Sequence, residues 1–439
     1  VRRRGAGRPG GDHAVLDRCG AEREHPQAGL VAGQRAGRHG HRHHRRRAGD
    51  ALRIQPVIGT GRNRGVAGGD HDRGSGRGEG WSAPVHRVAW LGGFELQTST
   101  QTVTQDRPDG GLSVQCTLQP KALEQLMPGH DTLGLHQRLS KTKDDPADWT
   151  VEREIAVALL GSPHLFSFAN LSALQSHIRV RRNMVLAARK TALAFKTVAA
   201  ERPEADWRYQ EGPGFILNPG RPLIDALVAA TQPEATGKLY DFSCYRATEY
   251  VILLGIAQEL ATHHPALLAD LQQLNERHAV RSGQFHDVYL IEYGSMAAPL
   301  PSRFYVPGDR LWFRNPDERS SDIEGYEGSW VIYMGGGLFS NFWQRDRPFT
   351  LESKAIEIFH WRHGAMVDSQ GQLFMDESVV EQQVAQTERD PQARQQVLER
   401  MVRMRDPQGV YAEGGCIDAT REHPRSVSPD DCQLVLPTF

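Results

Sequence analysis

The sequence predicts an α+β fold in which long helices precede a run of antiparallel strands. Residues 171–195 and 245–262 carry apolar residues at helical spacing, and the second segment is apolar on most sides, as buried helices are. After residue 300 the pattern changes to short apolar runs flanking Pro307-Gly308 and Gly335-Gly336-Gly337, which are turn sequences. Helices followed by such strands indicate a layered α+β arrangement.

Local signals place the individual elements. We expect helices at 152–160, 171–195, 222–230, 245–262 and 266–279, a hairpin at 207–216, and strands at 304–306, 310–313, 330–334, 338–342 and 355–361. Asn170 or Ser172 is expected to cap the helix at 171–195. The tail is expected to hold a short hairpin and a charged helix broken by Pro391, followed by loop.

Composition and periodicity divide the 439 residues into four parts. They are a disordered segment at 1–88, a polar connector with short elements at 89–160, the periodic domain at 161–365 and a C-terminal extension at 366–439. The net charge of −1 gives no general argument for binding nucleic acid or membranes, and no apolar run reaches the ~18 residues that span a bilayer. Without an apolar signal region, we expect a soluble, cytoplasmic protein.

The first 88 residues contain 18 Arg and no Lys, and are most basic and histidine-rich at 39–47. One interpretation is a basic arm that binds nucleic acid, and another is a metal-binding histidine tract. The third is that this part is not a genuine coding region, because GC-rich DNA in a wrong frame yields such a mixture. We favour the third, since avoidance of Lys has no electrostatic reason. Its few apolar residues predict disorder.

The five cysteines are Cys19, Cys116, Cys244, Cys416 and Cys432. An odd number without regular spacing is not typical of a disulfide framework, and the absence of a C-x-x-C pair argues against a structural zinc site. We therefore expect a reduced compartment and one special thiol.

Cys244 lies where a loop passes into the buried helix predicted at 245–262. Helix N-termini present unpaired N–H groups and partial positive charge, which favour the thiolate, the nucleophilic form of cysteine. Ser243 is the expected N-cap, and Arg246 in the first turn adds positive charge. The same N–H groups suit an oxyanion. The alternative is that Cys244 is simply a small buried apolar residue.

A thiolate enzyme also needs a group that exchanges protons with the leaving amine. The candidates near the predicted strands are Glu324, Glu327, Asn341, His360 and His363. Each has an alternative interpretation as an ordinary loop or strand-edge residue, and the sequence does not show which of them faces Cys244.

Several collinear motifs resemble the spore-type bacterial transglutaminases, which are protein-glutamine gamma-glutamyltransferases. The matching stretches, which fall within roughly 164–365, are Arg182-Asn183-Met184-Val185 with Ala187-Ala188, Trp207, Ile224-Asp225, Gly237 to Cys244, Pro307 to Pro316 and Gly328 to Ile332. The resemblance implies a papain-like core related to the NlpC/P60 amidases, with the nucleophile helix packed on an antiparallel sheet. It makes 161–365 the catalytic domain.

The resemblance also implies the chemistry. Cys244 would attack a protein glutamine, release ammonia and form a thioester, which a lysine amine or water then resolves. The partners would be protein substrates carrying Gln and Lys side chains, without a metal, calcium or another cofactor. Crosslinking of the spore coat is the family's setting.

This chain departs from the family pattern beside the nucleophile. The acid that precedes the cysteine is Ser243 here, the partner glutamate falls on Ser329, and the later histidine falls near Asn341. A shift of two residues lets Glu327 take the acid role, so the predicted catalytic residues are Cys244, Glu327 and Asn341. The alternatives are a cysteine amidase or peptidase of the same fold and a catalytically inactive structural or binding relative.

Overall fold

The computed structural model confirms a mixed helix and sheet architecture. It describes residues 51–54, 96, 99–106, 112–140, 147–195, 200–211, 214–279, 282–406 and 415–437. All of them belong to one compact unit, residues 48–439. Within these ranges, no helix is both long and apolar enough to cross a membrane.

The main sheet has four antiparallel strands in the order β7, β14, β8, β9. Their bounds are Leu290–Tyr293 for β7, Arg421–Pro424 for β14, Arg310–Arg314 for β8 and Gly328–Ile332 for β9. Strands β8 and β9 confirm the sequence prediction, with Trp312 paired to Trp330. The strand predicted at 304–306 is wrong, because this stretch has no regular structure. There the N–H of Val306 bonds to the side chain of Asp309 at 2.7 Å instead.

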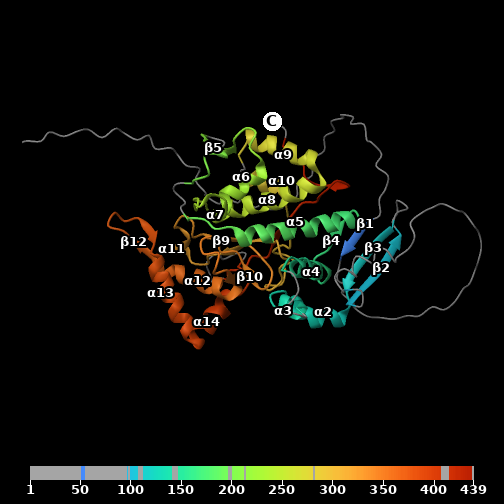
Figure 1. The fold of residues 1–439 in the computed structure, drawn as a ribbon. Helices are drawn as coiled ribbons and strands as arrows, with labels where there is room; N and C mark the ends of the chain where they lie inside the picture. Colours follow the sequence, from blue (N-terminus) through green and yellow to red (C-terminus); the bar gives the residue numbers. More distant parts are fainter. Residues whose placement is uncertain are drawn as a thin grey trace, which may run out of the picture. The chain divides into compact units, whose positions relative to one another are not determined.

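Helix α8 (Cys244–His263) is the central helix and confirms the prediction of a buried helix. It packs against α5 (Leu171–Lys190), α6 (Leu223–Thr231) and β9 (Figure 1). The predicted N-caps of α5 and α8 are confirmed. The side chain of Asn170 accepts from the N–H of Ala173 at 2.8 Å, and that of Ser243 accepts from the N–H of Arg246 at 3.4 Å.

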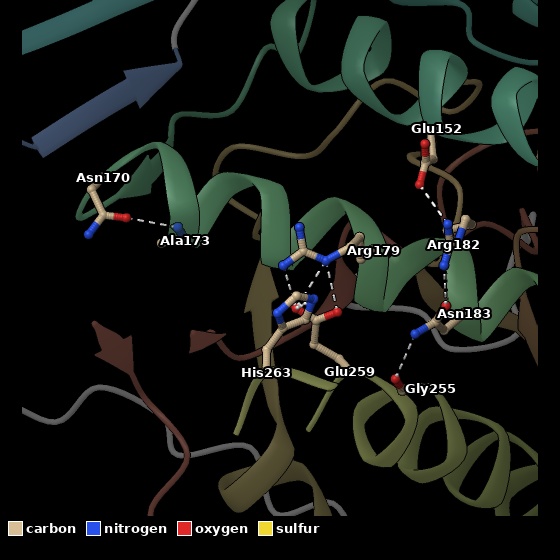
Figure 2. A network of polar contacts seen from close by, with 9 residues as sticks. All are labelled: Glu152, Asn170, Ala173, Arg179, Arg182, Asn183, Gly255, Glu259 and His263. Atoms are coloured by element: carbon tan, nitrogen blue, oxygen red, sulfur yellow. Dashed lines mark hydrogen bonds and ion pairs between the residues drawn. The ribbon is translucent and has the colours of Figure 1, made fainter. Parts of the chain in front are cut away.

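Helices α5 and α8 approach each other closely at Gly255. A Cβ atom at this position would lie 2.6 Å from Cγ and 2.9 Å from the backbone nitrogen of Met184, so only glycine fits. Figure 2 shows the polar contacts along the same interface. Arg179 holds the carboxylate of Glu259 with contacts of 2.7 and 3.0 Å, and the amide of Asn183 donates to the carbonyl of Gly255 at 3.4 Å.

Helix α12 (Leu351–Gly364) corrects the prediction of a strand at 355–361. Thr350 and Ser353 form a capping box that starts the helix. Its β-branched and aromatic residues, which look like a strand in sequence, instead pack in a second core. That core also contains Val331 of β9, so α8 and α12 lie on opposite faces of this strand.

A second four-stranded sheet has the order β2, β3, β1, β4. The strands are β1 (Ala51–Ile54), β2 (Thr100–Asp106), β3 (Leu112–Leu118) and β4 (Phe166–Phe168). Strand β1 corrects the prediction of disorder for four residues of the segment 1–88, because its backbone pairs with both β3 and β4. The rest of that segment, including 39–47, lies outside the described residues.

The remaining elements surround these sheets. They are α2 (Pro120–Leu126), η2 (Pro128–His130), α3 (Leu135–Leu139), α4 (Ala147–Leu160), β5 (Trp207–Gln210), β6 (Gly214–Leu217), α7 (Pro233–Thr236), α9 (Pro265–Arg277), α10 (Ser282–Tyr289), α11 (Glu318–Ser321), β10 (Leu338–Phe339), β11 (Phe349–Thr350), β12 (Ala365–Val367), β13 (Leu373–Met375), α13 (Glu377–Arg389), α14 (Pro391–Met401), β15 (Val427–Ser428) and β16 (Asp431–Cys432). The hairpins β5–β6 and β12–β13 and the helix break at Pro391 confirm the sequence predictions.

The residues after 365 do not form a separate extension. Strand β14 lies inside the main sheet between β7 and β8, where Glu422 is opposite both Glu292 and Arg310. The sequence boundary at 365 therefore cuts through one sheet. It failed because β14 is built from polar residues, whose burial depends on ion pairs rather than on an apolar run.

Glu154 of α4 is buried against the turn that follows β9. Its carboxylate accepts from the N–H of Gly336 at 3.0 and 3.1 Å and lies 3.3 Å from the hydroxyl of Tyr333. His136 is 3.9 Å away on the exposed side. Burial outweighs these hydrogen bonds and raises the pKa of Glu154 to about 7.

The raised pKa makes stability depend on pH. Between the unfolded value of 4.5 and about 7 the native protein holds a proton that the unfolded chain has released, so the free energy of unfolding should fall as pH rises through this window. The total is at most about 3.5 kcal/mol, at about 1.4 kcal/mol per pKa unit. Buried histidines with lowered pKa values, such as His360 and His423, add stability over the same range, so the contribution of Glu154 is measured as a difference between proteins. In urea unfolding at pH 5 and pH 8, the wild type should lose stability relative to Glu154→Gln as the pH rises. The exposed-carboxylate control Glu124→Gln should show the same relative loss as the wild type, and an equal slope in all three proteins would contradict the assignment.

Candidate active site around Cys244

Cys244 is the first residue of α8; the residue as a whole is partly exposed, whereas its sulfur is buried. The loop before it is held by the chain that follows α5. The N–H of Ala194 donates to the carbonyl of Tyr240 at 2.9 Å, and the N–H of Phe242 donates to the carbonyl of Ala194 at 3.1 Å. This short parallel pairing fixes the direction in which the chain enters α8, and with it the position of the thiol.

The sulfur of Cys244 faces the edge of β9 that is turned away from β8. The N–H of Tyr333 donates to the carbonyl of Asp309, and that of Asn315 donates to Glu327. Odd-numbered residues of β9 therefore bond to β8, and the N–H of Trp330 points away from it. This N–H bonds to the sulfur, as does the N–H of Tyr245 in the first turn of α8.

The resting thiol differs from the sequence prediction of a stabilised thiolate. Burial is the largest influence on the sulfur and raises the pKa of Cys244 above its usual value of 9.0. The N–H of Trp330, the charge of Lys354 and the N–H of Tyr245 oppose this effect without cancelling it, and Glu327 adds to it. Helix position alone did not reveal this, because desolvation depends on the surrounding fold.

Glu327 is the predicted acid that the structure brings within electrostatic reach of Cys244. It is half-buried just before β9, and its carbonyl accepts from the N–H of Asn315 at 3.1 Å. Burial raises the pKa of Glu327 above its usual value, with a smaller contribution from Glu324. A carboxyl group with a raised pKa near a thiol is suited to accept and return a proton.

Asn341 is buried, and both ends of its amide hold its own loop. The amide nitrogen donates to the carbonyl of Arg347 at 2.9 Å, and the amide oxygen accepts from the N–H of Gln344 at 3.2 Å. In this arrangement Asn341 shapes the turn between β10 and β11. Its predicted part in catalysis stays a prediction.

The other candidates lie in different surroundings. His360 and His363 belong to α12, where their Nδ1 atoms are 2.9 Å apart and His360 also contacts the hydroxyl of Thr387 at 2.8 Å. Glu324 is exposed. Ser329 is buried and, by strand alternation, shares the face of β9 that packs against the second core with Val331.

Lys354 of α12 is a site residue that sequence reasoning missed. It is the only buried lysine within the described ranges. Its ammonium lies 3.1 Å from Glu357 and 3.6 Å from the centre of the Phe349 ring, and its charge lowers the pKa of Cys244. The sequence predicts a strand at 355–361, directly after Lys354, although the Thr350 and Ser353 pair is a readable signal for a helix start.

Aromatic side chains surround the nucleophile. The ring of Tyr245 meets that of Trp330 edge to face at 5.2 Å, and Trp312 stacks on Trp330 at 6.1 Å. All three are partly exposed.

No group of three or more His, Cys, Asp or Glu side chains converges as metal ligands would in the part of the chain that the structure describes. Around the sulfur, the site offers a thiol with two N–H donors, a carboxyl group with a raised pKa and a buried ammonium. Such a set is suited to acyl transfer through a thioester.

The chain is similar to known proteins over much of its length. Residues 134–430 match the family model described as protein-glutamine gamma-glutamyltransferase. A protein-glutamine gamma-glutamyltransferase of Halalkalibacterium halodurans is 25% identical over 198 residues, which are 43% of this chain and 62% of that relative. A solved transglutaminase from Geobacillus stearothermophilus, without its C-terminal extension, is 18% identical with a TM-score of 0.34, over 48% of this chain and 97% of that chain.

The raised pKa of Cys244 predicts slow alkylation at neutral pH. At pH 7.5 iodoacetamide should modify Cys244 more slowly than a free thiol of pKa about 8.5, and the rate should keep rising with pH beyond 9. Peptide mass spectrometry can follow each cysteine separately, with buried Cys416, whose pKa is raised to about 12, as a slow internal reference. A rate that levels off below pH 8 would show that the thiol is ionised at rest.

Proposed function

We propose that this chain, which belongs to the protein-glutamine gamma-glutamyltransferase family, uses Cys244 to transfer the acyl group of a protein glutamine to a lysine amine. The observation that carries the proposal is the position of Cys244, where two backbone N–H groups, from Tyr245 and Trp330, meet the sulfur. The matched relative is aligned over 62% of its length, so its activity comes to this chain as part of the proposal.

The proposed fold is papain-like. In support, the helix that begins with the nucleophile packs on one face of an antiparallel sheet and is closed on its other sides by α5 and α6. In this arrangement the helix N-terminus, rather than a loop, positions the nucleophile.

In the first half-reaction the thiol of Cys244 attacks the carboxamide carbon of a glutamine side chain. Its proton passes to the carboxylate of Glu327, and the negative charge that develops on the carbonyl oxygen is stabilised by backbone N–H groups at the start of α8 and the edge of β9. Collapse of the tetrahedral intermediate breaks the C–N bond. Glu327 returns the proton to the leaving nitrogen, ammonia departs, and a thioester on Cys244 remains.

In the second half-reaction a neutral lysine amine attacks the thioester carbon. Glu327 accepts a proton from the attacking nitrogen, the C–S bond breaks, and the thiolate takes the proton back. The products are an isopeptide bond and the free thiol of Cys244. Water in place of the amine gives glutamate, so the same site supports deamidation.

Glu327 takes the acid role because the family's acid positions hold serines in this chain, Ser243 and Ser329. Ser243 is committed to capping α8, and Ser329 is on the face of β9 that packs with the second core. Glu327 lies within electrostatic reach of the sulfur, and burial raises the pKa of its carboxyl group above the usual value.

A catalytically inactive binding relative is the second candidate. The raised pKa of the resting thiol and the two serines at acid positions favour it. In that case Cys244 and Glu327 would be structural, and neither half-reaction would occur.

The proposal predicts ammonia release from a glutamine peptide and incorporation of a primary amine such as dansylcadaverine into a glutamine protein. Cys244→Ala should abolish both signals. Glu327→Gln should lower kcat by about 100- to 10,000-fold, because a positioned acid–base group contributes that much.

The matched control is Glu324→Gln, which neutralises an exposed carboxylate three residues from Glu327. It should retain kcat within about twofold. Ammonia release without amine incorporation would assign the site to an amidase, and a complete absence of both signals in the folded wild-type protein would support the inactive relative.

A further inference from the structure

Arg310 connects the two residues whose N–H groups meet the sulfur of Cys244. Its guanidinium carbon lies 4.4 Å from the ring centre of Tyr245 and 4.3 Å from that of Trp330. The two rings touch each other edge to face. One planar cation therefore fixes a residue from the first turn of α8 and a residue from the edge of β9.

The Arg310 side chain is buried and forms an ion pair with Glu422 that lacks hydrogen-bond geometry. It is only 1% exposed, and its Nε lies 2.9 Å from Oε2 of Glu422 on the neighbouring strand β14. The other carboxylate oxygen of Glu422 contacts Nδ1 of His286 at 2.9 Å. A second carboxylate near Arg310 belongs to Glu249. This residue is buried in α8 and forms an ion pair with Arg246 at 2.9 Å.

We propose that Arg310 is a positioning residue for the nucleophile: by stacking against both Tyr245 and Trp330, it sets the separation of the two N–H donors on either side of the Cys244 sulfur. This inference rests on the proposed function, because those donors matter when a thiolate or an oxyanion forms between them. Arg310 does not contact the sulfur and acts through its neighbours.

The chemistry of the side chain explains why arginine occupies the position. A guanidinium is planar and can lie against two aromatic rings while its N–H edge faces a carboxylate, whereas a lysine ammonium is a compact, strongly hydrated point charge. Donors that stabilise developing charge must be held within a fraction of an ångström to be effective. A residue that formed only the ion pair with Glu422 would leave the rings of Tyr245 and Trp330 without this contact.

The test compares the alkylation rate of Cys244 in Arg310→Lys with that in the wild type. This measurement needs no glutamine substrate. Lysine keeps the positive charge opposite Glu422 but loses the stack. We expect the alkylation rate at pH 8 to fall about tenfold, which corresponds to a rise of one unit in the thiol pKa. Amine incorporation should show a lower kcat with little change in KM, because the N–H donors act on the transition state.

Two further variants separate positioning from folding. Trp330→Leu leaves the ion pair of Arg310 with Glu422 in place and removes one of the two rings, and it should give the same slow alkylation. Arg314→Met is the matched control, because Arg314 is on the same strand and lies over the ring of Trp312 at 5.5 Å, away from Tyr245. It should alkylate at the wild-type rate.

Circular dichroism and thermal melting establish that each variant is folded. The proposal is overturned if folded Arg310→Lys or, where that variant does not fold, folded Trp330→Leu alkylates within twofold of the wild type. Because alkylation does not depend on transglutaminase activity, a protein that shows the shift but incorporates no amine would uphold the role of Arg310 and reject the proposed function.

Discussion

The contact between the N-terminus of α8 and the edge of β9 that is turned away from β8 is the constraint on which the site depends. Burial on nearly every side fixes α8 against α5, α6 and the sheet, so its first residue has little freedom to move. Strand β9 is an edge strand, and its even-numbered N–H groups are not used by β8. One backbone donor is therefore available to meet the sulfur of Cys244 without any loss to the sheet.

This constraint has two opposing electrostatic effects. Enclosure by α8, β9 and α12 removes water from the sulfur and disfavours its charged form, which is why the pKa of Cys244 is raised. The same enclosure lowers the local dielectric constant, so each fixed N–H and nearby charge acts more strongly on charge that appears during reaction. A thiol that is neutral at rest is thus compatible with a site organised for a charged intermediate.

The features that the sequence predicted correctly are those whose signals lie in neighbouring residues of the chain. The caps of Asn170 and Ser243, the buried character of α8 and the β8 and β9 strands depend on neighbouring residues and are confirmed. Strand β14 and Lys354 depend on the tertiary fold. Polar residues such as Glu422 become a central strand only because Arg310 and His286 pair with them. The raised pKa of Cys244 is likewise a property of packing rather than of its segment.

The substitution of serine at both family acid positions changes the charge balance around the thiol. A carboxylate beside a sulfur raises the thiol pKa further, as Glu327 does here, so each acid that is replaced by serine removes one source of that effect. What remains is one carboxyl group and one ammonium, Glu327 and Lys354, acting in opposite directions on the same sulfur. In the proposed mechanism, the proton transfers of both half-reactions therefore pass through Glu327. The N–H donors must then supply the charge stabilisation, which makes the stack that holds Tyr245 and Trp330 in place more important in this chain than it would be beside a second carboxyl group.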